Sequence, residues 1–61
     1  MSMTLARAMC NGGLVKGFAE VRRYISAKSI TVNGDLATAW DQVVHVGDII
    51  KLGKRRTYIV Q

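Results

Sequence analysis

The chain has 61 residues, of which 49% are hydrophobic, and its nine Lys and Arg against four Asp and Glu give a formal net charge of +5. One cysteine excludes an internal disulfide and a cysteine-rich metal site, and no apolar run reaches the length of a membrane span. We expect a single small domain without a metal or cofactor, located in the cytoplasm, that binds polyanions and not membranes.

The first predicted element is a short helix near the N-terminus. Leu5, Ala8 and Met9 are spaced i, i+3, i+4, which places them on one helical face. Ser2 or Thr4 can cap its first turn, and two consecutive glycines after residue 11 end it.

A second helix is predicted to begin at Gly17. Phe18, Val21 and Ile25 form an apolar stripe at i, i+3, i+7, which we expect to face the core.

Two adjacent arginines, Arg22 and Arg23, follow on the neighbouring sector of this helix, between small residues that would let a phosphate backbone approach. Glu20 precedes Arg23 by three residues, so a solvated local ion pair is the alternative role for Arg23. Arg22 borders the apolar stripe, and we expect it to be the better RNA ligand. Lys28 follows at the corner after the helix.

A strand and a turn come next. Residues 30–32 are β-branched throughout, residues 33–34 are the tight-turn pair Asn-Gly, and residues 35–38 return in extended form. Residues 39–42 should be a surface connection. Trp40 in that connection is either a lid on the core or a stacking platform for a base.

The last third predicts a β-hairpin, because residues 49–52 and 57–60 both have a strand pattern. Its cations are Lys51 in the first strand and Lys54, Arg55 and Arg56, which we expect to concentrate at an outward-reaching tip. The predicted fold is α+β, with two short N-terminal helices packed on a small, mainly antiparallel sheet of three to five strands.

Catalysis by this chain alone is not expected. The acids Glu20, Asp35, Asp41 and Asp48 are isolated, and neither a phosphate-cradling glycine loop nor a dinucleotide fingerprint is present.

Three segments in order carry a resemblance to a known family: residues 19–25 with two arginines, residues 30–34 (ITVNG) and residues 46–50 (VGDII). The set resembles the RNA-binding domain first defined in small-subunit ribosomal protein S-four, with its alpha-L motif. Residues 25–34 and 53–60 are most similar to the C-terminal tRNA-binding domain of bacterial-type tyrosyl-tRNA synthetases. One departure stands at Gly17 and Phe18, where the family usually has serine and arginine.

The resemblance implies that residues 1–61 are a C-terminal fragment of an ATP-dependent tyrosine–tRNA ligase that is homodimeric through a separate catalytic domain. It also implies that the partner is tRNA, with tRNA-Tyr first among candidates. The residues expected to contact RNA phosphates are Arg22, Arg23, Lys28, Lys51, Lys54, Arg55 and Arg56.

Three alternatives stay open. A small stand-alone ribosome-associated protein of the same family would use the same surface on ribosomal RNA. The domain would also suit the N-terminal guide of a pseudouridine synthase, or a module whose basic face binds an acidic protein.

Overall fold

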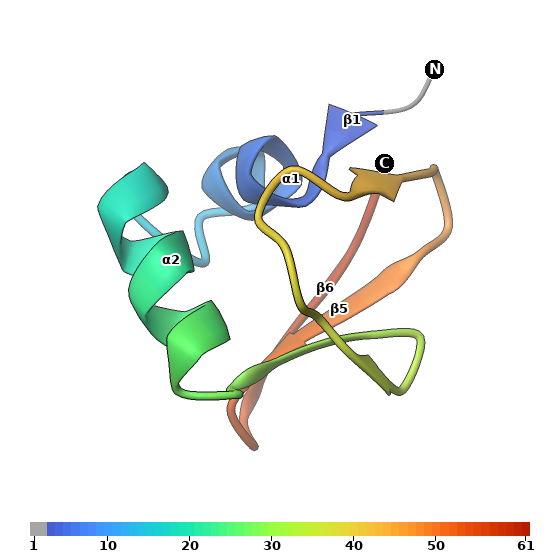
Figure 1. Ribbon diagram of the computed structural model, residues 1–61. Helices are drawn as coiled ribbons and strands as arrows, with labels where there is room; N and C mark the ends of the chain where they lie inside the picture. Colours follow the sequence, from blue (N-terminus) through green and yellow to red (C-terminus); the bar gives the residue numbers. More distant parts are fainter. Residues whose placement is uncertain (1–2) are drawn as a thin grey trace.

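Residues 3–61 are described by a computed structural model, and they form two helices and six short strands. In chain order these are β1 (Met3–Thr4), α1 (Leu5–Asn11), α2 (Phe18–Ser26), β2 (Ile30–Val32), β3 (Asp35–Leu36), β4 (Val43–Val44), β5 (Ile49–Leu52) and β6 (Arg56–Ile59) (Figure 1). The strands make two antiparallel sheets, one of order β3-β2-β5-β6 and one of order β1-β4. The predicted α+β class with two N-terminal helices is confirmed. The pairing of β1 with β4 was not predicted.

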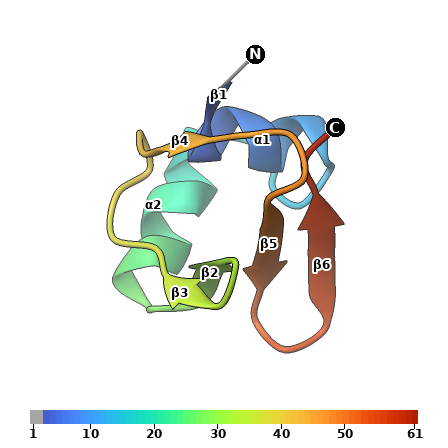
Figure 2. The same ribbon diagram turned by 90° about the vertical axis from the view of Figure 1, so that its right-hand side faces the viewer.

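Figure 2 shows α1 and α2 beside the four-stranded sheet, with β1 and β4 running next to α1. Within the described residues, neither helix has the length and apolarity that a membrane span requires.

Helix α1 begins at a side-chain cap, as predicted for Thr4. The Thr4 Oγ1 accepts a hydrogen bond from the Arg7 backbone N–H at 3.3 Å. Ser2, the other predicted cap, lies outside the described residues. The predicted apolar face is buried in the core, which confirms the helical spacing of Leu5, Ala8 and Met9.

The end of α1 is a Schellman turn built on Gly13, which adopts a positive φ of 74°. The Leu14 N–H donates to the Met9 carbonyl at 2.9 Å, and the Gly13 N–H donates to the Cys10 carbonyl at 3.1 Å. This turn returns the chain to the core, where Leu14 and Val15 are buried.

Gly12 is required for a different reason, which is close packing. A Cβ added at Gly12 would lie 2.6 Å from the Tyr58 ring, whereas Gly12 itself has an ordinary φ of −81°. The ring of Tyr58 packs against the core from β6 and occupies the space that a side chain at Gly12 would need.

Helix α2 begins after Gly17, as predicted, but its apolar stripe enters the core only in part. Val21 is fully buried and Ile25 is half-buried against the core, whereas Phe18 is 54% exposed. The expectation that Phe18 faces the core is therefore wrong. Phe18 is the first residue of a nine-residue helix, and its ring packs on Trp40 instead of on the core.

The four-stranded sheet has one buried face and one exposed face. Alternate residues of β2 and β5 face the helices and are buried: Ile30, Val32, Ile50 and Leu52. Thr31, Lys51 and Thr57 are cross-strand partners on the opposite face, because side chains directly paired across strands share a face. The strands predicted at residues 30–32 and 49–52 are confirmed.

Candidate nucleic-acid interface

The positive charge of this protein is exposed and is not neutralised by its own acids. All nine Lys and Arg side chains are in the exposed class. Among residues 3–61, no Lys or Arg lies within ion-pair distance of a carboxylate, and the one acid–base contact is between His45 and Asp48. Cations that lack internal partners leave their full field available to a polyanion.

Arg22 and Arg23 lie on the exposed side of α2, in its later turns. The ion pair between Glu20 and Arg23, considered as an alternative, does not form. The Glu20 carboxylate instead accepts the Lys16 backbone N–H at 2.7 Å, just before the helix starts. Glu20 therefore has a structural role at the helix N-terminus, and Arg23 is left without a carboxylate partner.

A shallow open groove of about 260 Å³ runs along the same helix beside Arg23. Its lining consists of Glu20, Arg23, Tyr24 and Ala27, which are spaced i, i+3, i+4, i+7 along α2. Ala27, the C-cap of α2, is the smallest of these residues.

Lys28 forms the corner after α2 in a backbone conformation that disfavours a side chain. Its φ is +57°, and it is the left-handed residue of a second Schellman turn. In that turn the Ser29 N–H donates to the Tyr24 carbonyl at 2.9 Å, and the Lys28 N–H donates to the Ile25 carbonyl at 3.0 Å. Glycine is the usual residue there, and a lysine costs about 1–2 kcal/mol more. Local backbone preference therefore does not explain why a lysine stands at this position.

The corner and the hairpin tip are joined by a backbone hydrogen bond. The Ser29 carbonyl accepts the Gly53 N–H at 2.8 Å, so Lys28 and Lys54 each lie one residue from this bond. Both views of the fold place the end of α2 and the β5–β6 turn at the same end of the molecule (Figures 1 and 2). We call Lys28, Lys54 and Arg55 the basic end.

The remaining two predicted ligands do not join the basic end in the same way. Lys51 projects from the outer face of the sheet, opposite to the face that packs on the helices. Arg56 pairs with Leu52 and so emerges on the helix-facing side, where its Nη1 donates to the Leu14 carbonyl at 3.1 Å. The expectation that all three tip cations are free to reach outward therefore needs correction for Arg56.

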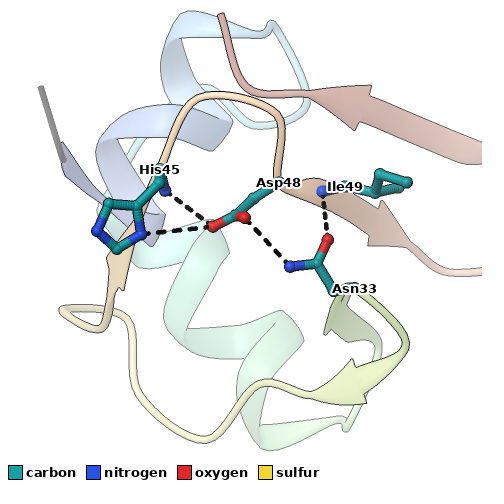
Figure 3. A network of polar contacts seen from close by, with 4 residues as sticks. All are labelled: Asn33, His45, Asp48 and Ile49. Carbon is teal, nitrogen blue, oxygen red and sulfur yellow. Dashed lines mark hydrogen bonds and ion pairs between the residues drawn. The ribbon is translucent and has the colours of Figure 1, made fainter.

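The tight turn predicted from Asn-Gly is tied by side chains to the turn that precedes Asp48 (Figure 3). The Asn33 Oδ1 accepts the Ile49 N–H at 2.8 Å, and its Nδ2 donates to Asp48 Oδ1 at 3.1 Å. The Asp48 Oδ2 accepts the His45 backbone N–H at 2.8 Å. These donors, His45 first and then Asn33, hold the pKa of Asp48 below its ordinary value.

This network gives Asn33 a role within the protein. Its φ is +53° and that of Gly34 is +88°, the backbone of the predicted tight turn. Because both polar groups of its side-chain amide are used by Ile49 and Asp48, Asn33 shapes the motif and does not offer a free RNA contact.

The sequence did not predict one exposed feature, which is the contact between the rings of Phe18 and Trp40. Their centroids are 5.5 Å apart and their planes meet at 35°. The residues are 22 positions apart in different elements, so no local spacing could indicate the pair. Trp40 is 40% exposed and is not one of the buried core residues.

Comparison with known proteins returned no matching family model, no similar curated protein and no similar solved structure.

Proposed function

We propose that this protein binds structured RNA through its phosphate backbone. The observation that carries the proposal is the group of exposed cations without carboxylate partners along α2 and at the basic end. Arginine's planar guanidinium can hold a phosphate through two hydrogen bonds, and lysine adds a mobile point charge. Double-helical RNA presents mainly phosphates, ribose hydroxyls and a shallow groove, so charge and shape are what such a surface can recognise.

The strain at Lys28 supports this proposal. A positive φ at a lysine has no structural benefit that glycine would not provide at lower cost. A cation at this corner, next to the hairpin tip, is useful if it contacts a phosphate that the tip also approaches.

Transfer RNA is the RNA we propose first, with the protein acting as the tRNA-binding part of a cytoplasmic tyrosine–tRNA ligase. What supports this choice is the resemblance of residues 25–34 and 53–60 to the C-terminal tRNA-binding domain of bacterial-type tyrosyl-tRNA synthetases. Under this proposal the chain joins no tyrosine itself, and its contribution is to hold the tRNA.

The test is a binding titration with three RNAs and one acidic polypeptide, followed by fluorescence anisotropy. The RNAs are tRNA-Tyr, an unrelated tRNA and a ribosomal RNA stem, and polyglutamate stands for an acidic protein. We expect tRNA-Tyr to bind tightest and polyglutamate to bind weakly at physiological salt. Equal binding of polyglutamate and RNA would contradict the proposal, and tighter binding of the ribosomal stem would replace tRNA by ribosomal RNA.

Arg22→Ala should weaken tRNA binding several-fold without unfolding the protein, because Arg22 is exposed. Arg7→Ala is the matched control, since Arg7 is an exposed arginine on α1 outside both cation groups. An equal loss in the two variants would indicate a nonspecific charge effect and would count against Arg22 as a ligand.

A further inference from the structure

Phe18 and Trp40 form an exposed aromatic pair, and neither is one of the buried core residues. Both rings are substantially exposed, at 54% and 40%, although only four of the 61 residues are aromatic. Large aromatic side chains bury well, so two that meet each other at the surface leave a ring face for something else.

The pair is held in place from both sides by backbone contacts. The Trp40 carbonyl accepts the Ala6 N–H at 3.0 Å, and the Gln42 carbonyl accepts the Leu5 N–H at 2.8 Å. These bonds use N–H groups of the first turn of α1, which have no partner within that helix. The loop that carries Trp40 is thus fixed to α1, while Phe18 is fixed by α2. A surface that is already ordered binds a ligand without a large entropic cost.

Two exposed cations lie close to Phe18 along the chain, and one exposed acid, Asp41, follows Trp40. Arg22 lies one helical turn after Phe18 on the same side of α2, which brings residues i and i+4 to about 6 Å between Cβ atoms. Lys16, also exposed, precedes the helix by two residues. Aromatic faces beside cations suit a nucleotide, whose base stacks and whose phosphate is anionic, better than an apolar peptide or a second copy of this basic chain.

We propose that Phe18 and Trp40 stack one unpaired nucleobase of the bound RNA while Arg22 contacts a phosphate next to that base. The inference rests on the proposed function and adds to it a preference for a double helix that has a neighbouring single-stranded nucleotide. Unpaired bases are the parts of RNA that aromatic side chains can stack upon.

The exposed aliphatic side chains on the outer face of the sheet make a useful contrast. Leu36, Ile49 and Ile59 surround Lys51 there, but they offer no aromatic ring for stacking. The aromatic pair is therefore the surface that this proposal assigns to a base.

Three RNA probes test the proposal: a blunt hairpin closed by a non-nucleotide linker so that it has no unpaired base, the same hairpin with a three-nucleotide 3′ extension, and that extension made abasic. We expect the extended hairpin to bind at least about fivefold tighter than the blunt one, the lower end of the effect of one stacked base. The abasic extension should give no such gain, because it keeps the phosphates and lacks the bases. Trp40 is the single tryptophan, so stacking should also quench the intrinsic fluorescence with the extended probe alone.

Phe18→Leu should remove most of the gain from the extension and leave blunt-hairpin binding unchanged, and it retains Trp40 as the reporter. Val46→Ala is the control, since Val46 is an exposed apolar residue on the turn between β4 and β5, and it should keep the full gain. Circular dichroism melts verify that both variants are folded.

Equal affinity for the blunt and extended hairpins, or an equal gain from the abasic extension, would overturn the base-stacking inference and leave phosphate recognition standing. A failure of all three probes to bind would overturn both proposals.

Discussion

Replacing Lys28 by glycine should make the protein more stable and a weaker RNA binder at the same time. The left-handed φ of +57° costs a side-chain-bearing residue about 1–2 kcal/mol, and glycine removes this cost. Glycine also gives the unfolded chain more freedom, which offsets about 0.4–1 kcal/mol of that gain. The expected net change is a stabilisation of about 0.5–1 kcal/mol, which is measurable in a domain whose free energy of unfolding is about 3–5 kcal/mol.

The comparison variant is Lys28→Ala, which removes the charge but keeps a Cβ in the left-handed conformation. Urea unfolding followed by circular dichroism measures stability, and anisotropy titration with a labelled tRNA measures affinity. We expect both variants to weaken tRNA binding to a similar extent, and only Lys28→Gly to raise the urea midpoint. Wild-type affinity in Lys28→Gly would show that this cation is not an RNA ligand. A urea midpoint for Lys28→Gly below that of the wild type would contradict the inference that Lys28 is strained.

Three further predictions concern the fold. Gly12→Ala should destabilise the protein by about 1–3 kcal/mol in urea unfolding, because its Cβ would overlap the Tyr58 ring; a wild-type midpoint would disprove this packing. Gly17→Ser should stabilise by about 0.5–1 kcal/mol, since Gly17 caps α2 without a side-chain bond and a Cβ there meets nothing; an unchanged melting temperature would contradict it. The lowered pKa of Asp48 means that its hydrogen bonds to His45 and Asn33 stabilise the fold fully above the unfolded-state pKa, about 3.9. That contribution disappears as pH falls through the lower folded-state pKa, so Asp48→Asn should show less loss of stability than wild type below about pH 4, and parallel acid melts would contradict this.

Much of the fold was predictable because its boundaries are marked by residues with a local physical role. Thr4 caps α1, Gly13 ends it, and the Asn-Gly turn at residues 33–34 joins β2 to β3. Each of these signals depends on backbone geometry within a few residues, which sequence alone displays. The β5–β6 hairpin was predictable for the same reason.

The features that sequence could not show depend on contacts between distant segments. β1 and β4 have two residues each, too few to display an alternating pattern, and their paired residues are 39 and 41 positions apart in the chain. The stripe on α2 predicted that Phe18 faces the core, but helical spacing could not show that its ring would pack on Trp40 instead. The pairing of Arg56 with Leu52 likewise depends on hairpin register, and a shift by one residue would place Arg56 on the other face.

In the candidate site, as in the fold, local features could be predicted from the sequence and contacts between distant segments could not. Sequence identified the cations, and their exposure is consistent with the proposed role, but only the three-dimensional arrangement separates Lys51 on the outer face from the basic end. The bond between Ser29 and Gly53 that brings Lys28 next to the tip is a backbone contact, which leaves no signature in side-chain composition.

The salt dependence of tRNA binding tests the central claim most directly. Binding to phosphates releases counterions, so contact with about four to six phosphates predicts a slope of about −3 to −5 in log affinity against log salt concentration. The measurement is an anisotropy titration of the wild-type chain with tRNA-Tyr at several salt concentrations between about 50 and 200 mM. A slope in this range would support backbone recognition by the exposed cations. Affinity that stays constant across these concentrations would contradict it.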